Sequence, residues 1–460
     1  MSGPSPSERG PQFEAWDRAH VWHPFTPHSV YADEDPLMVV AAEGHELIAA
    51  DGQRYLDGVS SIWCASFGHR RAELDTALAD QAGRLAHATF LGNASAPGVA
   101  LAKRLSDLAP GGLTRVFYSD DGSTAVEAAL KIAVQFHLQT DAPERDTFLT
   151  LGNAYHGDTV GAVSLGGIPL FHERYKAVVF ETAEASPPAC YRCPWDKDPA
   201  TCALECVDGF RAAVAEHGPR LAAVVLESGF QGAGGIVPLP DGYLAAAAQA
   251  AHEAGALVIL DEVASGMGRT GHMFACEAEP TAVEPDLLCL AKGLTGGMLP
   301  LAATLATERV FEAFLGPPEE GRTFFHGHTF TGNALGSAVA LAALDLLERG
   351  GVLAGVAQRA AWLAARLEGL VGMSGVGDVR QRGLMAGVEL VADRASRESY
   401  PVAERRGMSV CSAARERGVF LRPLGDVIVL CPPLTITEEE VQRLVDAVAA
   451  GIREVCADGV

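Results

Sequence analysis

The sequence predicts an α/β protein, with a mostly parallel central sheet in a large domain and a smaller α+β domain beside it. Between about residues 70 and 330, short and wholly apolar runs alternate with segments of helical periodicity. Such strands are typical of parallel sheets covered by helices on both faces. Beyond about residue 335, two long helical patterns lead into a mixed ending. The chain should therefore divide into an N-terminal segment (1–70) that contributes to the small domain, a large ligand-binding domain (71–334) and a C-terminal small domain (335–460).

The individual elements follow in order from the hydrophobic periodicity. The N-terminal part mixes short strand-like runs with loops, as in HELIAADGQRYLDG. The large domain is expected to contain strands at 115–120, 147–155, 221–228, 256–266 and 287–293, with helices at 123–139 and 242–255. The C-terminal part is expected to contain helices at 335–349 and 352–370, then strand-like runs at 387–391, 419–424 and 426–434.

The composition argues against nucleic acid and membrane partners. Asp and Glu number 58 against 35 Lys and Arg, which gives the 460 residues a formal net charge of -23. Such a surface repels phosphate backbones and anionic lipids. The first residues, MSGPSPSERGPQ, are polar and rich in proline, unlike a signal peptide, and we find no long apolar run that could span a membrane. We therefore expect a cytoplasmic protein that binds small molecules.

Four of the ten cysteines lie close together in CYRCPWDKDPATCALEC. They are Cys190, Cys193, Cys202 and Cys206. Four thiolates can hold a tetrahedral zinc ion. The second spacing is looser than in most zinc ribbons, however, so a surface segment without metal is the favoured interpretation, and no metal is assigned.

Three polar residues stand where apolar strands are expected to end. Glu227 closes LAAVVLE, Asp261 closes ALVILD, and Lys292 follows LLCLA. Ligands of open parallel sheets lie outside the carboxyl ends of the strands, so these side chains would face one crevice. An ammonium that loses its hydration there has a lowered pKa and becomes a nucleophilic amine. An aldehyde is the natural partner of such an amine, and pyridoxal phosphate supplies one.

Other motifs fit the remaining parts of that cofactor. Gly122 and Ser123 open a helix in DDGSTAVEAALK, where backbone N–H groups could hold the phosphate. Tyr155 in NAYHGDT offers an aromatic face for the ring. Asp261 could keep the ring nitrogen protonated, and Thr329 in FFHGHTFTGN could give the phosphate a hydroxyl.

Each of these residues alone has an ordinary explanation. Lys292 could be a loop lysine with its amine in water, Asp261 a helix cap, and Gly122 a plain helix start. The cofactor interpretation is favoured because all the positions fit one ligand.

At this point the motifs carry a resemblance. LDEVASGMGRTGHMFACE and PDLLCLAKGLTGGMLPLAAT resemble the cofactor segment of class III aminotransferases, which are pyridoxal phosphate enzymes of fold type I. More narrowly, WHPFT, DGVSSIW, FYSDDGSTAVEAALK, YHGDTVGAVS, ESGFQGAGG, FFHGHTFTGN and LRPLGDVIVLCPPL resemble the 7,8-diaminopelargonic acid aminotransferase branch. That branch converts 8-amino-7-oxononanoate to 7,8-diaminononanoate in biotin biosynthesis. The similarity runs from about residue 20 to 455.

The resemblance implies catalytic roles for three residues. Lys292 would be joined to the cofactor and would move the proton during a ping-pong transamination. Asp261 would pair with the pyridine nitrogen. Tyr155 would stack over the ring and contact the substrate. Glu227 would lie near the cofactor without an assigned role.

The resemblance also implies the remaining cofactor contacts and a homodimer. Gly122, Ser123 and Thr329 would hold the phosphate, with His328 beside Thr329 in the same loop. Thr329 would reach across from the other subunit, so that the active site lies at the subunit interface.

Substrate contacts complete what the resemblance implies. Arg422 would bind the carboxylate of 8-amino-7-oxononanoate, which suits a planar guanidinium. Trp63 and Gly327 would line the substrate channel, together with Phe25 and Ile62.

Two of these positions depart from the members that use S-adenosylmethionine as amino donor. Those members carry a tyrosine at the position of Phe25 and a second tryptophan at the position of Ile62. The departures remove a hydroxyl and an aromatic face that could contact a sulfonium cation, and such contacts contribute about 0.5–2 kcal/mol. Lysine is therefore the favoured donor, and S-adenosylmethionine is the alternative. The two positions could also simply repack.

Other functions remain to be weighed against this one. A different class III ω-aminotransferase, acting on a β- or γ-amino acid or a diamine, would use the same chemistry at Lys292. A dinucleotide-binding oxidoreductase is disfavoured, because GFQGAGG and GLTGGM do not give the spacing G-x-G-x-x-G between a strand and a helix. A scaffold without activity has no support, because the lysine, aspartate and arginine are all present. A hydrolase of the G-x-S-x-G type is excluded, because we find no such motif.

Overall fold

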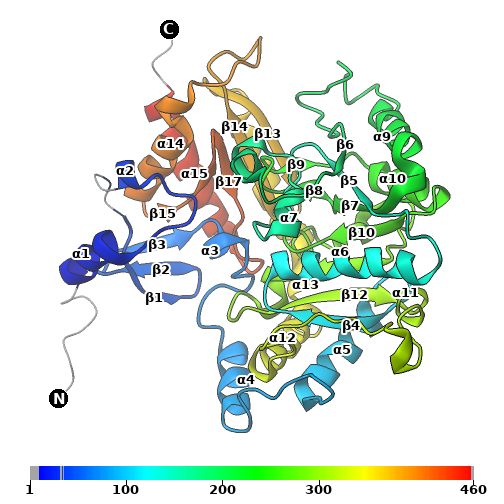
Figure 1. Ribbon diagram of the computed structural model, residues 1–460. Coiled ribbons are helices and arrows are strands. Elements are labelled where there is room, and N and C mark those ends of the chain that lie inside the picture. The colour runs from blue at the N-terminus through cyan, green and yellow to red at the C-terminus, as the bar shows by residue number, and fades with distance from the viewer. Residues whose placement is uncertain (1–9, 32–33, 35, 457–460) are drawn as a thin grey trace.

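The structure is a computed structural model, and it describes residues 10–31, 34 and 36–456. A seven-stranded sheet forms the centre of the larger part of the molecule (Figure 1). β12 runs antiparallel to both of its neighbours, and the other strands run parallel to one another, so the mostly parallel sheet is confirmed. In spatial order the strands are β4 (Leu113–Ser119), β12 (Ala302–Thr307), β11 (Leu287–Leu290), β10 (Leu257–Asp261), β7 (Leu221–Glu227), β5 (Thr147–Leu151) and β6 (Ala183–Ala185).

Both faces of this sheet are covered, as the apolar strands predict. Leu257 and Ile259 of β10 belong to one buried cluster, which they share with α6 (Gly122–Gln139). Val258 and Leu260 belong to the other buried cluster. That second face is covered by α10 (Tyr243–Glu253), which packs on β10 and β7 and lies against α9 (Glu205–His217). Alternating side chains of one strand thus enter two separate cores.

The remaining strands form smaller sheets. One contains β13 (Val376–Arg382), β14 (Met385–Leu390), β17 (Val427–Leu430) and β16 (Pro423–Leu424) in that order, all antiparallel. The other contains β1 (Val39–Glu43), β2 (Glu46–Ala49), β3 (Arg54–Asp57) and β15 (Val419–Phe420). A short ribbon joins β8 (Phe230–Gln231) to β9 (Val237–Pro238).

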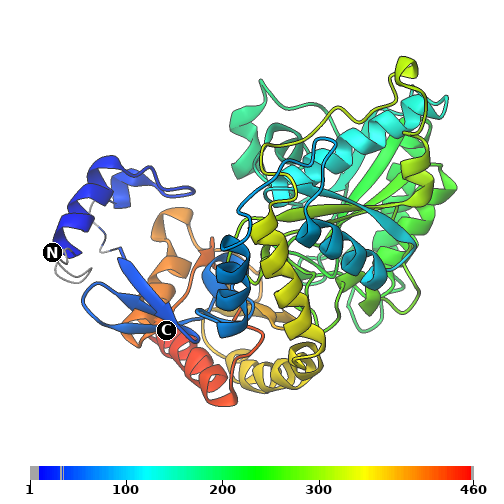
Figure 2. The same cartoon turned by 90° about the horizontal axis from the view of Figure 1, so that it is seen from below.

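The two ends of the chain meet in one of these sheets. β15 pairs parallel with β3, with Val419 opposite Leu56. Figure 2 shows the first and last segments together on one side of the molecule and the large sheet on the other. The proposed boundaries at residues 70 and 334 stay a prediction.

Helices complete the structure. α12 packs on α4 and α5, whereas α15 packs on α13 and α14. The longer ones are α1 (Gly10–His20), α4 (Ala72–Ala82), α5 (Ala96–Leu108), α12 (Ala334–Glu348), α13 (Val352–Leu367), α14 (Arg406–Glu416) and α15 (Glu438–Val455). The short ones are α2 (His28–Tyr31), α3 (Ser60–Trp63), α7 (Val160–Ser164), α8 (Pro169–His172) and α11 (Glu308–Glu312).

Some expected bounds differ from the structure. The strands expected at 147–155 and 256–266 end early, at Leu151 and Asp261, because polar and glycine-rich residues follow. The run 419–424 is divided between β15 and β16, which belong to different sheets. The buried strand β12 and the charged strand β13 were both missing from the strands expected from the sequence.

Candidate active site

Three strand ends bring Glu227, Asp261 and Lys292 together. β7, β10 and β11 are neighbours and run parallel, and Glu227 lies opposite Asp261 in the register. Lys292 follows β11 and begins a 3₁₀ turn, with φ of 39°. Because all three strands end at the same edge, their terminal side chains meet in the crevice that the sequence predicts.

This crevice is a cleft of about 430 Å³. Eight of the residues singled out in the sequence line it: Ile62, Trp63, Gly122, Ser123, Tyr155, Glu227, Asp261 and Lys292. They come from α3, the start of α6, the loop after β5 and the three strand ends. Segments far apart in the sequence therefore build a single site.

Lys292 supplies an amine with unusual surroundings. Its Nζ lies over the ring of Trp63, 5.3 Å from the ring centroid. Burial lowers the pKa of Lys292, although the charge of Asp261 partly offsets this effect. A lysine whose pKa is lowered has a larger uncharged fraction, so it can act as a nucleophile and as a base.

Asp261 is held in place by two donors. One carboxylate oxygen lies 2.8 Å from Nδ1 of His156, and the other accepts the N–H of Val263 at 2.9 Å. Burial alone would lower the pKa of His156, but the hydrogen bond and the charge of Asp261 outweigh it and raise that pKa. A cationic imidazole favours the ionised carboxylate, and an ionised carboxylate can keep a nearby ring nitrogen protonated.

His156 was missed in the sequence. The side chain is fully buried, and its Nε2 has no hydrogen-bond partner among the described residues. Its position directly after Tyr155 in YHGD was the only available signal. Nothing in that motif tells which of the two rings turns toward Asp261.

The start of α6 has room for an anion. The carboxylate of Asp121 accepts the N–H of Thr124 at 2.9 Å, which satisfies the third residue of the helix. Gly122 and Ser123 precede it and line the cleft, so their N–H groups are available to a ligand. The partial positive charge of a helix start favours phosphate at this point.

Close packing around this helix start requires glycine at two positions. A Cβ on Gly122 would lie 2.5 Å from a methyl group of Val263. A Cβ on Gly157 would collide with Ser123, and φ of Gly157 is 129°, which other residues rarely adopt. The N–H groups at the start of α6 suit a phosphate, the amine of Lys292 suits an aldehyde, and the carboxylate of Asp261 suits a protonated ring nitrogen. These residues therefore fit pyridoxal phosphate.

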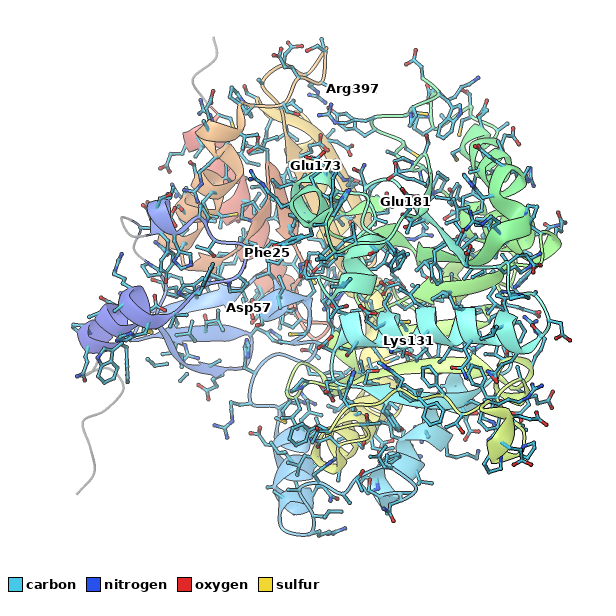
Figure 3. All side chains as sticks on the ribbon, in the orientation of Figure 1. Phe25, Asp57, Lys131, Glu173, Glu181 and Arg397 are labelled. Carbon is cyan, nitrogen blue, oxygen red and sulfur yellow. The ribbon has the colours of Figure 1, made fainter. Side chains whose placement is uncertain are left out.

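Tyr155 connects the cleft to the surface through a row of rings. Its hydroxyl donates to Asp158 at 2.6 Å, and burial together with this bond raises the pKa of Tyr155. Its ring meets Phe171 edge-on at 6.0 Å, and Phe171 meets Phe25 at 5.3 Å. Phe25, labelled in Figure 3, belongs to the N-terminal segment between α1 and α2.

Phe25 and Arg422 do not line the Lys292 cleft. Both line a neighbouring groove of about 1460 Å³. Arg422 is exposed, and it forms no hydrogen bond or ion pair with the rest of the described chain. The structure thus places these two predicted substrate contacts outside the cleft, next to it.

Gly327, His328 and Thr329 are also outside the cleft of their own chain. His328 lies 3.4 Å from Asp120, which lines the cleft, but His328 itself does not line it. The same loop places the ring of Phe330 5.2 Å from that of His87. In a single chain, therefore, these three predicted residues do not meet Lys292.

The structure brings the four cysteines of this segment to one small cavity, and the expectation that they hold no metal stays a prediction. Cys190, Cys193, Cys202 and Cys206 have free thiols and line a cavity of only about 20 Å³. Within residues 10–31, 34 and 36–456, no three Cys, His, Asp or Glu side chains are grouped as metal ligands.

Over the same residues, no helix has the length and apolar character needed to cross a membrane.

The sequence profile of the aminotransferase class-III family matches residues 29–452. The adenosylmethionine-8-amino-7-oxononanoate aminotransferase of Geobacter sulfurreducens is 49% identical, over 96% of this chain and 97% of its own length. The enzyme of the same name from Nitratidesulfovibrio vulgaris is 50% identical, over 99% and 84%.

Solved structures agree in fold. The crystal structure of adenosylmethionine-8-amino-7-oxononanoate aminotransferase from Methanocaldococcus jannaschii has a TM-score of 0.92 and 42% identity, covering 97% of this chain and 99% of that one. A thermostable (S)-enantioselective omega-transaminase from Thermomicrobium roseum also has a TM-score of 0.92, with 36% identity and 97% and 98% coverage.

Proposed function

Because the chain belongs to the class III aminotransferases, which depend on pyridoxal phosphate, we propose that it makes 7,8-diaminononanoate from 8-amino-7-oxononanoate. One observation carries the chemistry: the amine of Lys292 and the carboxylate of Asp261 line one cleft, at the ends of adjacent parallel strands. The names of the relatives at 49% and 50% identity support the choice of substrate.

The reaction follows from what these side chains do. Pyridoxal phosphate, when bound, supplies an aldehyde carbon and a ring that accepts electrons from the substrate carbon. Lys292, with its lowered pKa, would take the proton from the amine-bearing carbon of the donor and pass it to the cofactor carbon that receives the nitrogen. Asp261, in contact with His156, would keep the ring nitrogen protonated, and Tyr155 would contact the ring.

The two substrates react in turn at this site, as in ping-pong kinetics. The N–H groups of Gly122 and Ser123 would hold the phosphate in both half-reactions, so that the cofactor would stay bound while donor and acceptor exchange. Trp63 and Ile62 line the cleft where either substrate enters.

The neighbouring groove suits the far end of the oxo acid. Arg422 is exposed there, and its guanidinium is suited to a carboxylate. The rings of Tyr155, Phe171 and Phe25 lead from the cleft toward the groove, so an alkyl chain could lie along them.

We include lysine as the donor in this proposal. Phe25 at the groove lacks the hydroxyl of a tyrosine, and Ile62 in the cleft lacks the second aromatic face that could contact a sulfonium. The names of both relatives include adenosylmethionine, and this favours S-adenosylmethionine as the alternative donor. The test is to incubate the holoenzyme with 8-amino-7-oxononanoate and each donor, then measure 7,8-diaminononanoate by mass spectrometry. Product from adenosylmethionine and none from lysine would refute the donor assignment.

The proposal includes a homodimer in the cytoplasm. Gly327, His328 and Thr329 lie outside their own cleft, which is where residues that serve the other subunit's site would lie. Thr329 and His328 would then complete the partner's phosphate site, and Gly327 the partner's substrate channel. Sedimentation of the wild-type protein tests the dimer. Thr329→Ala should weaken cofactor binding, while the variant still sediments as a dimer.

The second candidate is another ω-aminotransferase, favoured by the likeness to the Thermomicrobium roseum enzyme. A growth test separates the two. Failure to rescue a biotin auxotroph that lacks this step, together with turnover of a diamine or β-amino acid, would favour the second candidate.

A further inference from the structure

The cysteine segment (190–206) has no role in the chemistry above, yet its sulfurs lie together. Four free thiols line one cavity of about 20 Å³, those of Cys190, Cys193, Cys202 and Cys206. A cavity of this size holds about one water molecule, so the side chains around it are close neighbours. Burial raises the pKa of Cys190, and the sulfurs of Cys202 and Cys193 raise it further, which is an effect of short range.

The four thiols differ in how easily a reagent reaches them. Cys190, Cys193 and Cys202 are partly exposed, whereas Cys206 is buried. Burial and the neighbouring Cys190 raise the pKa of Cys206 to about 11, so this side chain stays a thiol at neutral pH. Exchange with a disulfide requires an accessible thiolate. Cys206 is therefore poorly suited to start such a reaction.

The two residues after Cys190 fasten the cysteine segment to β14 and to the loop that follows it. Arg192 donates to the carboxylate of Glu389 at 2.9 and 2.7 Å and to the backbone carbonyl of Arg397 at 2.8 Å. Arg397, labelled in Figure 3, donates in return to the carbonyl of Tyr191, and its guanidinium lies 5.1 Å from the centre of the Tyr191 ring. These contacts hold the segment against a part of the chain about 200 residues away.

These contacts also decide which cysteines can pair without rearrangement. A disulfide between Cys190 and Cys193 would close a small ring around Tyr191 and Arg192, and the geometry of the bond would constrain the backbone of both. Cys202 instead lies near the other end of the cysteine segment. A bond from Cys190 to Cys202 therefore leaves the contacts of Tyr191 and Arg192 in place.

The cysteine segment forms one wall of the groove that contains Arg422. We propose that Cys190 and Cys202 form a reversible disulfide, which locks this wall in place. The oxidant is a low-molecular-weight disulfide such as oxidised glutathione. The sulfur of Cys202 attacks it and releases one thiol, and the sulfur of Cys190 then displaces the second. The two cysteine protons go to the two thiols released, and excess thiol reverses the reaction.

The bond acts on the state in which the cysteine segment has detached from β14. A disulfide stabilises mainly by restricting the less ordered state, and here it would close a loop over residues 190–202. Detachment should therefore become rarer in the oxidised protein. This inference goes beyond the transfer of amino groups and is independent of the proposed substrate and donor.

Mapping the disulfide tests the pairing. The holoenzyme is incubated with oxidised glutathione, its remaining thiols are alkylated, and disulfides are located by mass spectrometry. We expect one disulfide within the protein, between Cys190 and Cys202, which excess reduced glutathione removes. Cys193→Ser is the matched control, because it removes a thiol of the same cluster and should form the same bond.

Trypsin tests whether the bond locks the segment. Arg192 and Lys197 are exposed, so trypsin can cut after either one when the segment detaches. We expect the oxidised wild type to be cut there about tenfold more slowly than the reduced wild type, as measured by mass spectrometry after reduction. Cys202→Ser should be cut at the same rate with and without oxidised glutathione.

Three results would overturn the inference. The first is that oxidised glutathione produces no disulfide within the wild type, or one that joins a different pair of cysteines. The second is equal cutting of the oxidised and reduced wild type, because the bond would then lock nothing. The third is one tightly bound zinc ion per chain in the purified protein, since thiolates that ligate zinc are not free to pair.

Discussion

Asp261 and Glu227 lie opposite each other at the ends of neighbouring parallel strands, yet only Asp261 contacts a basic side chain. His156 bonds Asp261, whereas Glu227 receives only the backbone N–H groups of Gly232 and Tyr155. Two carboxyl groups on one sheet edge thus have different surroundings. The contact with His156 thus distinguishes the two carboxyl groups and supports the proposal that Asp261, rather than Glu227, pairs with the ring nitrogen of the cofactor.

Replacing Lys292 with alanine should remove the amine that bonds the cofactor and moves the proton. We expect turnover to fall by at least about a thousandfold, and borohydride to label no lysine at this position. The measurements are steady-state rates and mass mapping of the reduced protein. Normal turnover in Lys292→Ala would contradict the assignment.

Replacing Asp261 with asparagine keeps the shape of the side chain but removes its charge. We expect proton transfer to slow by about a hundredfold or more, whereas the affinity for the donor changes much less. Single-turnover absorbance with an α-deuterated donor measures this step. Asp146→Asn on the surface is the control, and equal effects of the two substitutions would argue against a role for Asp261.

Gly157→Ala should disturb the proposed phosphate site at the start of α6. The added Cβ would strike Ser123, and φ of 129° is unfavourable for alanine. We expect the cofactor dissociation constant to rise by about tenfold or more, measured by fluorescence titration of the apoenzyme. Gly372→Ala, with no atom near its Cβ, should bind the cofactor as the wild type does.

Removing the guanidinium at position 422 should affect one substrate only. We expect Arg422→Gln to raise KM for 8-amino-7-oxononanoate by about tenfold to a hundredfold, since a hydrogen bond to a charged group is lost. The donor half-reaction should be unchanged. If the wild type converts the methyl ester of the oxo acid as efficiently as the free acid, Arg422 does not bind the carboxylate.

Acid should weaken the contact between Glu440 and His45. Burial would raise the pKa of Glu440, but hydrogen bonds from His45 and the Thr437 backbone outweigh it and lower that pKa to about 2. A lowered pKa means that the stabilisation is complete above about pH 4.5 and is lost as the pH falls toward 2. Glu440→Gln should therefore cost about 1–3 kcal/mol at pH 7, and progressively less below pH 4.5.

Urea unfolding at pH 7, 4 and 3 measures this dependence. Glu439→Gln, an exposed residue in the same first helical turn, is the control and should show no such loss. A cost for Glu440→Gln that is the same at every pH would contradict the argument.

Sequence reasoning located the sheet and the strand ends because buried strands leave a strong apolar signal. Glu227, Asp261 and Lys292 interrupt that signal where the chain leaves the core. β13 left no such signal, because its charged residues are paired locally, as Arg380 is with Asp378 and Glu389. The contact of His156 with Asp261 was equally hidden, since it depends on how a loop folds over the next strand.

The positions of Arg422 and Thr329 outside the cleft could not be predicted, for a different reason. The motif around Arg422 predicts a carboxylate contact, but its distance from Lys292 depends on how two sheets pack together. Likewise, the position of Thr329 depends on a loop that lies across α6. Contacts between residues that are far apart in the sequence produce no local sequence pattern from which they could be predicted.

The pairing of β15 with β3 has a consequence for the order of events during translation. All seven strands of the large sheet have left the ribosome once Thr307 has emerged from it. The edge of β3, synthesised near the beginning, must wait until Val419 emerges. A nascent chain that stalls before that point would expose an unpaired strand edge, and such edges promote aggregation.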